Sequence, residues 1–210
     1  MIIMRFIIAI LVFSFKALRK LFISFKSTLF TPLAYLTLIV NGAKFGKGLK
    51  VRGLMKVIIT RRGRVIIGKN FKVNSGNNYN VIGRQQRTTL WVEGNLTIGD
   101  NVGISSTAII CNHSIVIGNN VIIGGNTVIY DTDFHSLDPF IRKSVLDNKQ
   151  AIKKPVIIMD NVFIGAHTTI LKGVTIGYNS IIGACSVVSK DIPSNEMWGG
   201  NPAKLIKSNN

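Results

Sequence analysis

The residue best suited to chemistry is His135, which lies in the segment DTDFHSLDPFIRK. A neutral imidazole can take a proton from a hydroxyl or an amine near neutral pH, and a nearby carboxylate or backbone carbonyl can fix its tautomer. Three carboxylates flank it, namely Asp131, Asp133 and Asp138. We therefore predict that His135 is a general base. Asp138 is followed by Pro139, a pair that more often forms a turn.

Other polar residues are candidates for contacts with the substrate. Arg142 could hold an anionic group, and Asp133 lies close to His135 in the chain. Asn112 and His113 occur in ICNHSIVIG, where the surrounding pattern slips by one residue. Either of them faces the acceptor, or the irregularity points them to solvent. We assign Asp133, Arg142 and Asn112 to substrate binding.

The sequence lacks the signatures of several other mechanisms. No GxSxG motif or Ser-His-Asp pattern appears, which suits direct transfer better than an acyl-enzyme. The two cysteines, Cys111 and Cys185, have no metal-ligand spacing, so we expect neither a disulfide framework nor a structural zinc site. A reducing cytoplasm is the expected compartment.

A six-residue repeat must position these residues. Aliphatic residues recur at positions 98, 104 and 110, then at 117, 123 and 129, and again every sixth residue from Ile158 to Val188. This period fits neither an amphipathic helix nor an alternating strand. Stacked short strands with a corner after each one bury the aliphatic position inside a prism. Gly165, Gly177 and Gly183 directly follow aliphatic residues, and we expect the corners there to need torsions that a Cβ resists.

The repeat predicts the domain organisation. We expect a β-helix over residues 42–207, with distorted first coils and outward loops over 46–97, where the pattern is ragged. The repeat breaks between Ile129 and Ile158. Long loops in compact repeat proteins are usually functional, so we predict an excursion loop over residues 130–157 that carries His135.

The charge is concentrated at the N-terminal end. Residues 1–92 contain 17 of the 26 Lys and Arg residues and no acid, because Glu93 is the first carboxylate. On a helical wheel, five cations of the first segment fall within an arc of roughly 120° on an otherwise apolar helix; they are Arg5, Lys16, Arg19, Lys20 and Lys26. We predict a basic amphipathic segment over residues 1–41, with a second helical part starting at Thr31 and Pro32.

This pattern favours an anionic membrane surface as a partner. The longest uncharged stretch is too short to span a bilayer, and no small-residue cleavage site follows it. An alternative is that the helical segment covers the open end of the prism and protects its edge strands. We do not expect nucleic acid as a partner, because the cations alternate with bulky aliphatic residues.

The repeats, the excursion DTDFHSLDPFIR and the ending SVVSKDIPSNEMWGGNPAKLIK together resemble the hexapeptide-repeat acyltransferases, in the branch of sugar O-acetyltransferases. The resemblance implies an all-β solenoid, a left-handed parallel β-helix that is an exception to the right-handed crossover rule. It also implies a homotrimer that binds acetyl coenzyme A between neighbouring prisms, with the loop histidine as general base.

The resemblance further implies a set of residues that bind the cofactor. Ala166 and Ala184 would present backbone groups to the pantetheine arm. Ser189 and Lys190 match the Ser/Thr-Lys pair of the family, and Lys204 matches its basic residue in the NPAK motif. Trp198 departs from the small aliphatic residue usual before that motif. It could stack on adenine or close the last coil.

We therefore expect a cytoplasmic, membrane-surface O-acetyltransferase that acts on a sugar hydroxyl, in a lipid-linked or surface-polysaccharide precursor. An N-acetyltransferase for amino sugars and a non-catalytic membrane-associated scaffold remain alternatives. A carbonic anhydrase on the same prism needs three metal-binding histidines, and the spacing of His113, His135 and His167 does not match that pattern, so we expect no metal site.

Overall fold

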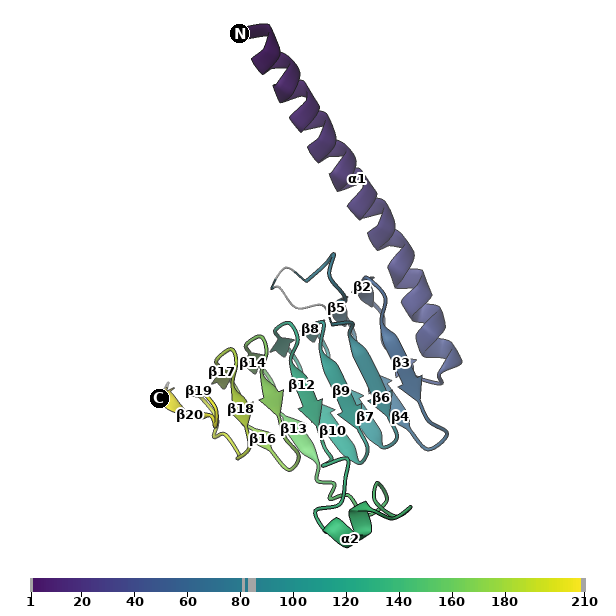
Figure 1. Ribbon diagram of the computed structural model, residues 1–210, viewed down its shortest axis with the longest axis vertical. Coiled ribbons are helices and arrows are strands. Elements are labelled where there is room, and N and C mark those ends of the chain that lie inside the picture. Colours follow the sequence, from purple (N-terminus) through teal and green to yellow (C-terminus); the bar gives the residue numbers. More distant parts are fainter. Residues whose placement is uncertain (1, 81, 83–85, 209–210) are drawn as a thin grey trace.

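A computed structural model describes residues 2–80, 82 and 86–208, without the side chains of residues 2, 23, 26 and 27. It begins with a long helix, α1 (Ile2–Val40), followed by a column of short strands (Figure 1). The predicted irregular segment YNVIGRQ lies partly outside the described residues, and so does the side chain of Lys26.

The strands form three sheets, one for each face of a prism, and all pairs are parallel except β19 with β20. The first sheet comprises β1 (Lys44–Phe45), β4 (Arg64–Ile67), β7 (Asn95–Ile98), β10 (Ser114–Ile117), β13 (Val156–Ile158) and β16 (Thr175–Ile176). The second comprises β2 (Lys50–Arg52), β5 (Lys72–Asn74), β8 (Gly103–Ser105), β11 (Ile122–Ile123), β14 (Phe163–Ile164), β17 (Ile181–Ile182), β19 (Glu196–Gly199) and β20 (Lys204–Ser208). The third comprises β3 (Lys56–Ile59), β6 (Thr89–Val92), β9 (Ala108–Cys111), β12 (Val128–Tyr130), β15 (Thr169–Ile170) and β18 (Val187–Val188).

The aliphatic positions of the repeat form the core. In the second sheet, Ile104, Ile123 and Ile164 are register partners on successive strands, and each is buried. Equivalent stacks fill the other two sheets. Each coil buries its aliphatic residues against the coils before and after it, which is the organisation of a solenoid. The predicted parallel β-helix with an N-terminal helical segment is confirmed. The first coils are more regular than expected, because β1 to β6 all take their places in the three sheets.

The corners correct our expectation about glycine. Gly165 and Gly177 do not have positive φ. A Cβ on Gly165 would instead lie 2.4 Å from the backbone nitrogen of Ala184 in the next coil. At the corner after the second sheet, left-handed torsions occur at Ser106, Asn126, His167 and Cys185. At the corner after the first sheet, they occur at six asparagines that are joined by side-chain hydrogen bonds of 2.9–3.1 Å, namely Asn70, Asn101, Asn120, Asn161, Asn179 and Asn195. Asparagine tolerates this conformation better than most other residues with a side chain.

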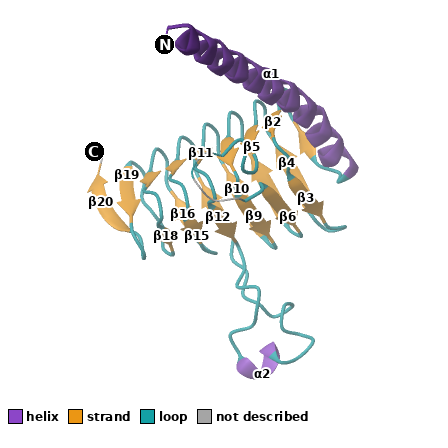
Figure 2. Cartoon of the chain, turned by 45° about the horizontal axis from the view of Figure 1, so that its top comes forward, coloured by secondary structure: helices purple, strands orange, loops and turns teal. Residues whose placement is uncertain are grey.

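Helix α1 is a single continuous helix that ends at Val40, so residues 31–40 are helical as predicted, but the predicted start of a second helix at Thr31 is wrong. Pro32 lies inside it. The hydroxyl of Thr31 accepts a hydrogen bond from the backbone N–H of Val51 at 3.0 Å, and Leu38 is completely buried in the core. These contacts hold the last turns of the helix on the first coil, where proline alone would favour an interruption. The preceding part of α1 projects away from the prism (Figure 2).

The predicted excursion loop leaves the prism between β12 and β13 and contains α2 (Pro139–Arg142). The two ends of the loop are joined by an antiparallel β-bridge between Thr132 and Lys153. The backbone N–H of Asp133 also donates to the carbonyl of Ile152 at 3.0 Å. The loop is thus held at a fixed point on the prism by a short stem.

Candidate functional site

A cleft of about 600 Å³ lies where the excursion loop meets the prism. We call it the loop cleft. One wall comes from the third sheet and the corner that follows it, and the other comes from the loop. Its lining residues are Arg62, Trp91, Glu93, Ile110, Asn112, Phe134, His135, Asn148, Lys149 and Lys153. The predicted general base and the predicted substrate ligand Asn112 therefore share one cleft, although they are distant in the chain.

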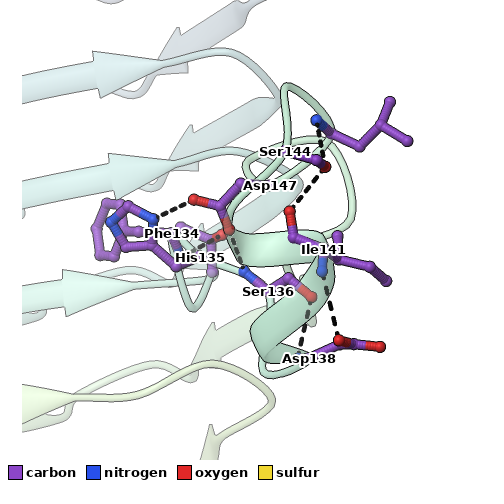
Figure 3. A network of polar contacts seen from close by, with 9 residues as sticks. Phe134, His135, Ser136, Asp138, Ile141, Ser144 and Asp147 are labelled. Atoms are coloured by element: carbon purple, nitrogen blue, oxygen red, sulfur yellow. Dashed lines mark hydrogen bonds and ion pairs between the residues drawn. The ribbon is translucent and has the colours of Figure 1, made fainter.

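His135 is oriented by Asp147, from the far side of the same loop (Figure 3). Its Nδ1 lies 2.5 Å from Asp147 Oδ2, and Asp147 Oδ1 accepts the backbone N–H of Ser136 at 2.7 Å. Because an ionised carboxylate can only accept, Nδ1 carries the proton and Nε2 presents its lone pair. Nε2 has no hydrogen-bond partner among the described residues. The His135 side chain is 63% exposed, so an acceptor can reach it.

The ionised form of Asp147 is favoured by this contact. The hydrogen bond from His135, followed by the one from the Ser136 backbone, lowers the pKa of Asp147 below its ordinary value of 3.8. Arg142 contributes a smaller lowering of the same pKa. Asp147 therefore stays a carboxylate at any pH at which the imidazole is neutral.

The carboxylates that flank His135 in the sequence have other tasks. Asp131 is fully buried and accepts the backbone N–H groups of Asn112 and His113, each at 2.7 Å. It thereby fixes the one-residue irregularity after β9. Burial, and secondly the neighbouring Asp131, raises the pKa of the Cys111 thiol to about 12. Asp131 is thus a structural residue.

Asp133 and Asp138 are also engaged away from the imidazole. Asp133 forms an ion pair with Lys172 at 2.6 Å and is not part of the cleft lining. Asp138 caps α2 by accepting from the backbone N–H of Phe140 at 2.7 Å, as the predicted turn with Pro139 requires. Arg142 is exposed at the end of α2 and lies outside the lining as well.

Asn112 is held by Glu93 at the floor of the cleft. Its amide nitrogen lies 3.4 Å from Glu93 Oε2, and its side-chain oxygen is buried without a hydrogen-bond partner. The other oxygen of Glu93 accepts from the indole N–H of Trp91 at 3.3 Å. Glu93 therefore orients both a polar amide and an aromatic ring.

The residues matched to the cofactor lie on another corner. Ala166 and Ala184 follow second-sheet strands on successive coils, and the backbone N–H of Cys185 donates to the Ala166 carbonyl at 2.8 Å. This corner is separated from the loop cleft by the width of the third sheet. Ser189 and Lys190 are exposed after β18, on the corner from which the excursion loop leaves, and Lys204 is exposed at the start of β20. One chain thus does not gather all of the predicted site residues.

Three other predicted positions are also placed. His113 is exposed and outside the loop cleft. His167 is half-buried next to Ala166, with a buried Nδ1 that has no partner. Trp198 packs against the core and donates its indole N–H to Glu196 at 2.6 Å. Its observed contacts are those of a residue that closes the last coil.

Sequence reasoning missed several residues of the cleft. Asp147 follows His135 by twelve positions on an irregular loop, and no periodic signal predicts that the loop folds back on itself. Arg62 and Trp91 sit on earlier coils in the stretch where the repeat is ragged. Lys149 and Lys153 were visible only as loop cations. Arg62 and Trp91 lie at or near the end of the third strand of a coil, which is the corner that carries the excursion loop, and this position was the available signal.

Comparisons with known proteins agree with this architecture. Residues 155–190 match the family model described as bacterial transferase hexapeptide (six repeats). The galactoside O-acetyltransferase of Escherichia coli (strain K12) is 37% identical over 144 residues, which are 69% of this chain and 54% of that protein. The chain spans about half the length of the curated relatives it matches.

Two solved structures of acetyltransferases also resemble this chain. A maltose O-acetyltransferase from Clostridium difficile 630 is 34% identical, with a TM-score of 0.50 over 66% of each chain. A hexapeptide-repeat acetyltransferase from Vibrio cholerae, in complex with acetyl coenzyme A, is 28% identical, with a TM-score of 0.50 over 77% of this chain and 70% of the other.

The prism of six-residue repeats with an imidazole on its one long excursion defines a class, the hexapeptide-repeat β-helix proteins. Within that class, the chain is similar to the hexapeptide-repeat acyltransferases, by the repeat matched over residues 155–190 and by the relatives named above.

Proposed function

We propose that the protein transfers an acetyl group from acetyl coenzyme A to a hydroxyl group of a sugar, with His135 as the general base. The observation that carries the proposal is the His135–Asp147 contact, which fixes the proton on Nδ1 and leaves Nε2 as a proton acceptor inside a cleft. The named activities of the galactoside and maltose O-acetyltransferases support the choice of a sugar acceptor.

The chemistry requires little beyond positioning and proton transfer. A thioester is already activated, so the acceptor oxygen can attack its carbonyl directly while Nε2 removes the hydroxyl proton. Collapse of the tetrahedral intermediate breaks the carbon–sulfur bond. The thiolate of coenzyme A leaves and takes the proton back from the imidazolium. Asp147 holds the ring in one tautomer and stabilises its transient positive charge.

The separation between the residues matched to the donor and the loop cleft supports an assembly of several copies, for which the family resemblance implies a homotrimer. In one chain, the corner with Ala166 and Ala184 and the loop cleft lie at opposite edges of the third sheet. A neighbouring copy that brings its second-sheet corner against the loop cleft would join the two halves. Lys190 and Lys204 are exposed cations suited to the phosphates of the donor.

The long exposed part of α1 supports a location at an anionic membrane surface on the cytoplasmic side, and with it a lipid-linked or surface-polysaccharide acceptor. Its apolar side chains, such as Phe13 and Leu18, are 75% and 66% exposed, and Arg5, Lys16 and Arg19 are exposed on the same helix. Among the described residues, no helix has the length and apolar character needed to cross a bilayer. A helix of this kind lies in the interface instead.

Release of free thiol from acetyl coenzyme A tests the proposal, with a panel of sugars, amino sugars and saccharide precursors as acceptors. We expect turnover with at least one sugar hydroxyl. His135→Ala should lower turnover by about 10²- to 10⁴-fold while the protein still binds acetyl coenzyme A. Transfer to amines alone would contradict the proposed hydroxyl acceptor and make the protein an N-acetyltransferase. Full activity of His135→Ala would exclude His135 as the base.

A further inference from the structure

The charges of the loop cleft are unbalanced. Arg62, Lys149 and Lys153 line it, against Glu93 as the lining carboxylate. Arg62 and Lys149 are exposed, and none of the three cations forms an ion pair in the part of the chain that the structure describes. Three cations against the carboxylates of Glu93 and Asp147 leave a formal excess of one positive charge around the neutral His135.

The acids around the cleft form no ion pair with these cations, because each makes its observed contacts with other groups. Glu93 accepts from Trp91 and Asn112, and Asp147 holds the imidazole. Asp133 pairs with Lys172 outside the lining. The cations are therefore available for a ligand that supplies the missing negative charge.

Trp91 adds a flat surface to the same cleft. The indole is 37% exposed on β6, and its N–H is directed to Glu93, so its orientation is fixed. An aromatic face held in this way packs well against the C–H face of a sugar ring. The cleft thus combines a ring platform, an amide and a group of cations around one proton acceptor.

We propose that the acceptor is an anionic saccharide. Its sugar ring packs on Trp91, and its phosphate or carboxylate group binds to Arg62, Lys149 and Lys153 while the reacting hydroxyl meets His135. This inference rests on the proposed acetyl transfer and narrows its substrate class. It goes beyond the galactoside and maltose acceptors of the relatives, which are named for neutral sugars.

Matched acceptors test the inference with the full-length protein. Thiol release is measured with each neutral hexose or N-acetylhexosamine beside its uronate and its monophosphate. We expect kcat/KM to be at least about tenfold higher for one anionic series, and this preference should decrease as salt is added. The uronate and phosphate series show which anion is used. Equal turnover of neutral and anionic acceptors would overturn the inference alone, whereas no turnover with any acceptor would overturn the proposed function and the inference with it.

Variants then assign the preference to the cleft. Arg62→Gln and the double change Lys149→Gln with Lys153→Gln should each reduce the ratio of anionic to neutral kcat/KM by about tenfold, without raising KM for acetyl coenzyme A. Lys143→Gln is the matched control, because Lys143 is an exposed cation of the same loop outside the cleft lining. If the variants instead raise KM for acetyl coenzyme A, the cations serve the donor and the inference is wrong.

Discussion

At the scale of single residues, the pair of His135 and Asp147 determines what the cleft can do. In an Asp147→Asn variant, the remaining side-chain oxygen can still accept the backbone N–H of Ser136, whose nitrogen lies 2.7 Å from Asp147 Oδ1. The side-chain amide nitrogen, in contrast, would face Nδ1 and favour the tautomer with the proton on Nε2.

We therefore expect Asp147→Asn to reduce kcat by at least about tenfold with little change in KM for acetyl coenzyme A. Asp138→Asn is the control on the same loop, since Asp138 only caps α2. Steady-state thiol release with saturating acceptor measures both. An equal loss in the two variants would show that the effect comes from the structure of the loop and not from the imidazole.

The lowered pKa of Asp147 gives a prediction about pH. The folded-state pKa lies below the ordinary value of 3.8, so the contact contributes stability at pH values above 3.8, which is lost as the pH falls through the lowered pKa. Carboxyl carbon NMR of the full chain should show a titration midpoint below 3.8 for Asp147. In His135→Ala, the main cause of the lowering is removed and the midpoint should move upward; an unmoved midpoint would contradict the contact.

At the scale of elements, the corners of the coils depend on close backbone approach. A Cβ at Gly165 would lie 2.4 Å from a backbone nitrogen of the next coil, whereas a Cβ at Gly183 would lie 3.6 Å from the nearest atom, the Cα of Gly199. Neither glycine has a positive φ. Because the two positions differ in the distance to the next coil but not in the sign of φ, alanine substitutions at both measure the effect of that distance alone.

We expect Gly165→Ala to lower the free energy of unfolding by about 1–3 kcal/mol and Gly183→Ala to leave it nearly unchanged. Urea unfolding of both variants, followed by circular dichroism, measures the difference. Similar values for the two would mean that the coils can separate slightly at Gly165 without cost.

The same elements show how far the sequence could be interpreted. The spacing of Ile98 and Ile104, and of the later repeats, predicts the coils because burial of one aliphatic residue in six is a local and repeated requirement. The predicted core position Ile110 is wrong, because Ile109 is the buried register partner of Ile129 and Ile110 lines the loop cleft. The gap after Ile129 likewise predicts the excursion that carries His135. The partner of His135 could not be predicted, because Asp147 reaches it through an irregular fold of the loop. Nor could the contacts that keep α1 helical through Pro32, which are made with a distant strand.

At the scale of the whole molecule, α1 has two parts with different surroundings. Ala34 and Leu38 are buried against the first coil, while residues 3–22 are exposed. The alternatives of end cap and surface helix therefore apply to different parts of one helix. The last turns cover the end of the prism, and the earlier turns are free to meet a membrane under the proposed function.

We expect removal of residues 1–29 to abolish sedimentation with anionic vesicles while the free energy of unfolding changes little. In contrast, Leu38→Ala should cost about 2–5 kcal/mol, because it removes a fully buried side chain. It should leave vesicle binding intact and so serves as the control. Vesicle binding that persists after the truncation would refute the surface role of the helix.

The C-terminal end of the prism affects whether further coils can stack on it. Parallel coils can in principle add to one another without limit, as in a fibre whose every layer is a template for the next. Here β20 runs antiparallel to β19, so the terminal edge of the second sheet has the opposite polarity from the strands beneath it. A further coil that continued the parallel ladder of the second sheet would find the free edge of β19 already paired with β20. The reversed strand thus occupies the position at which the next coil of this sheet would stack.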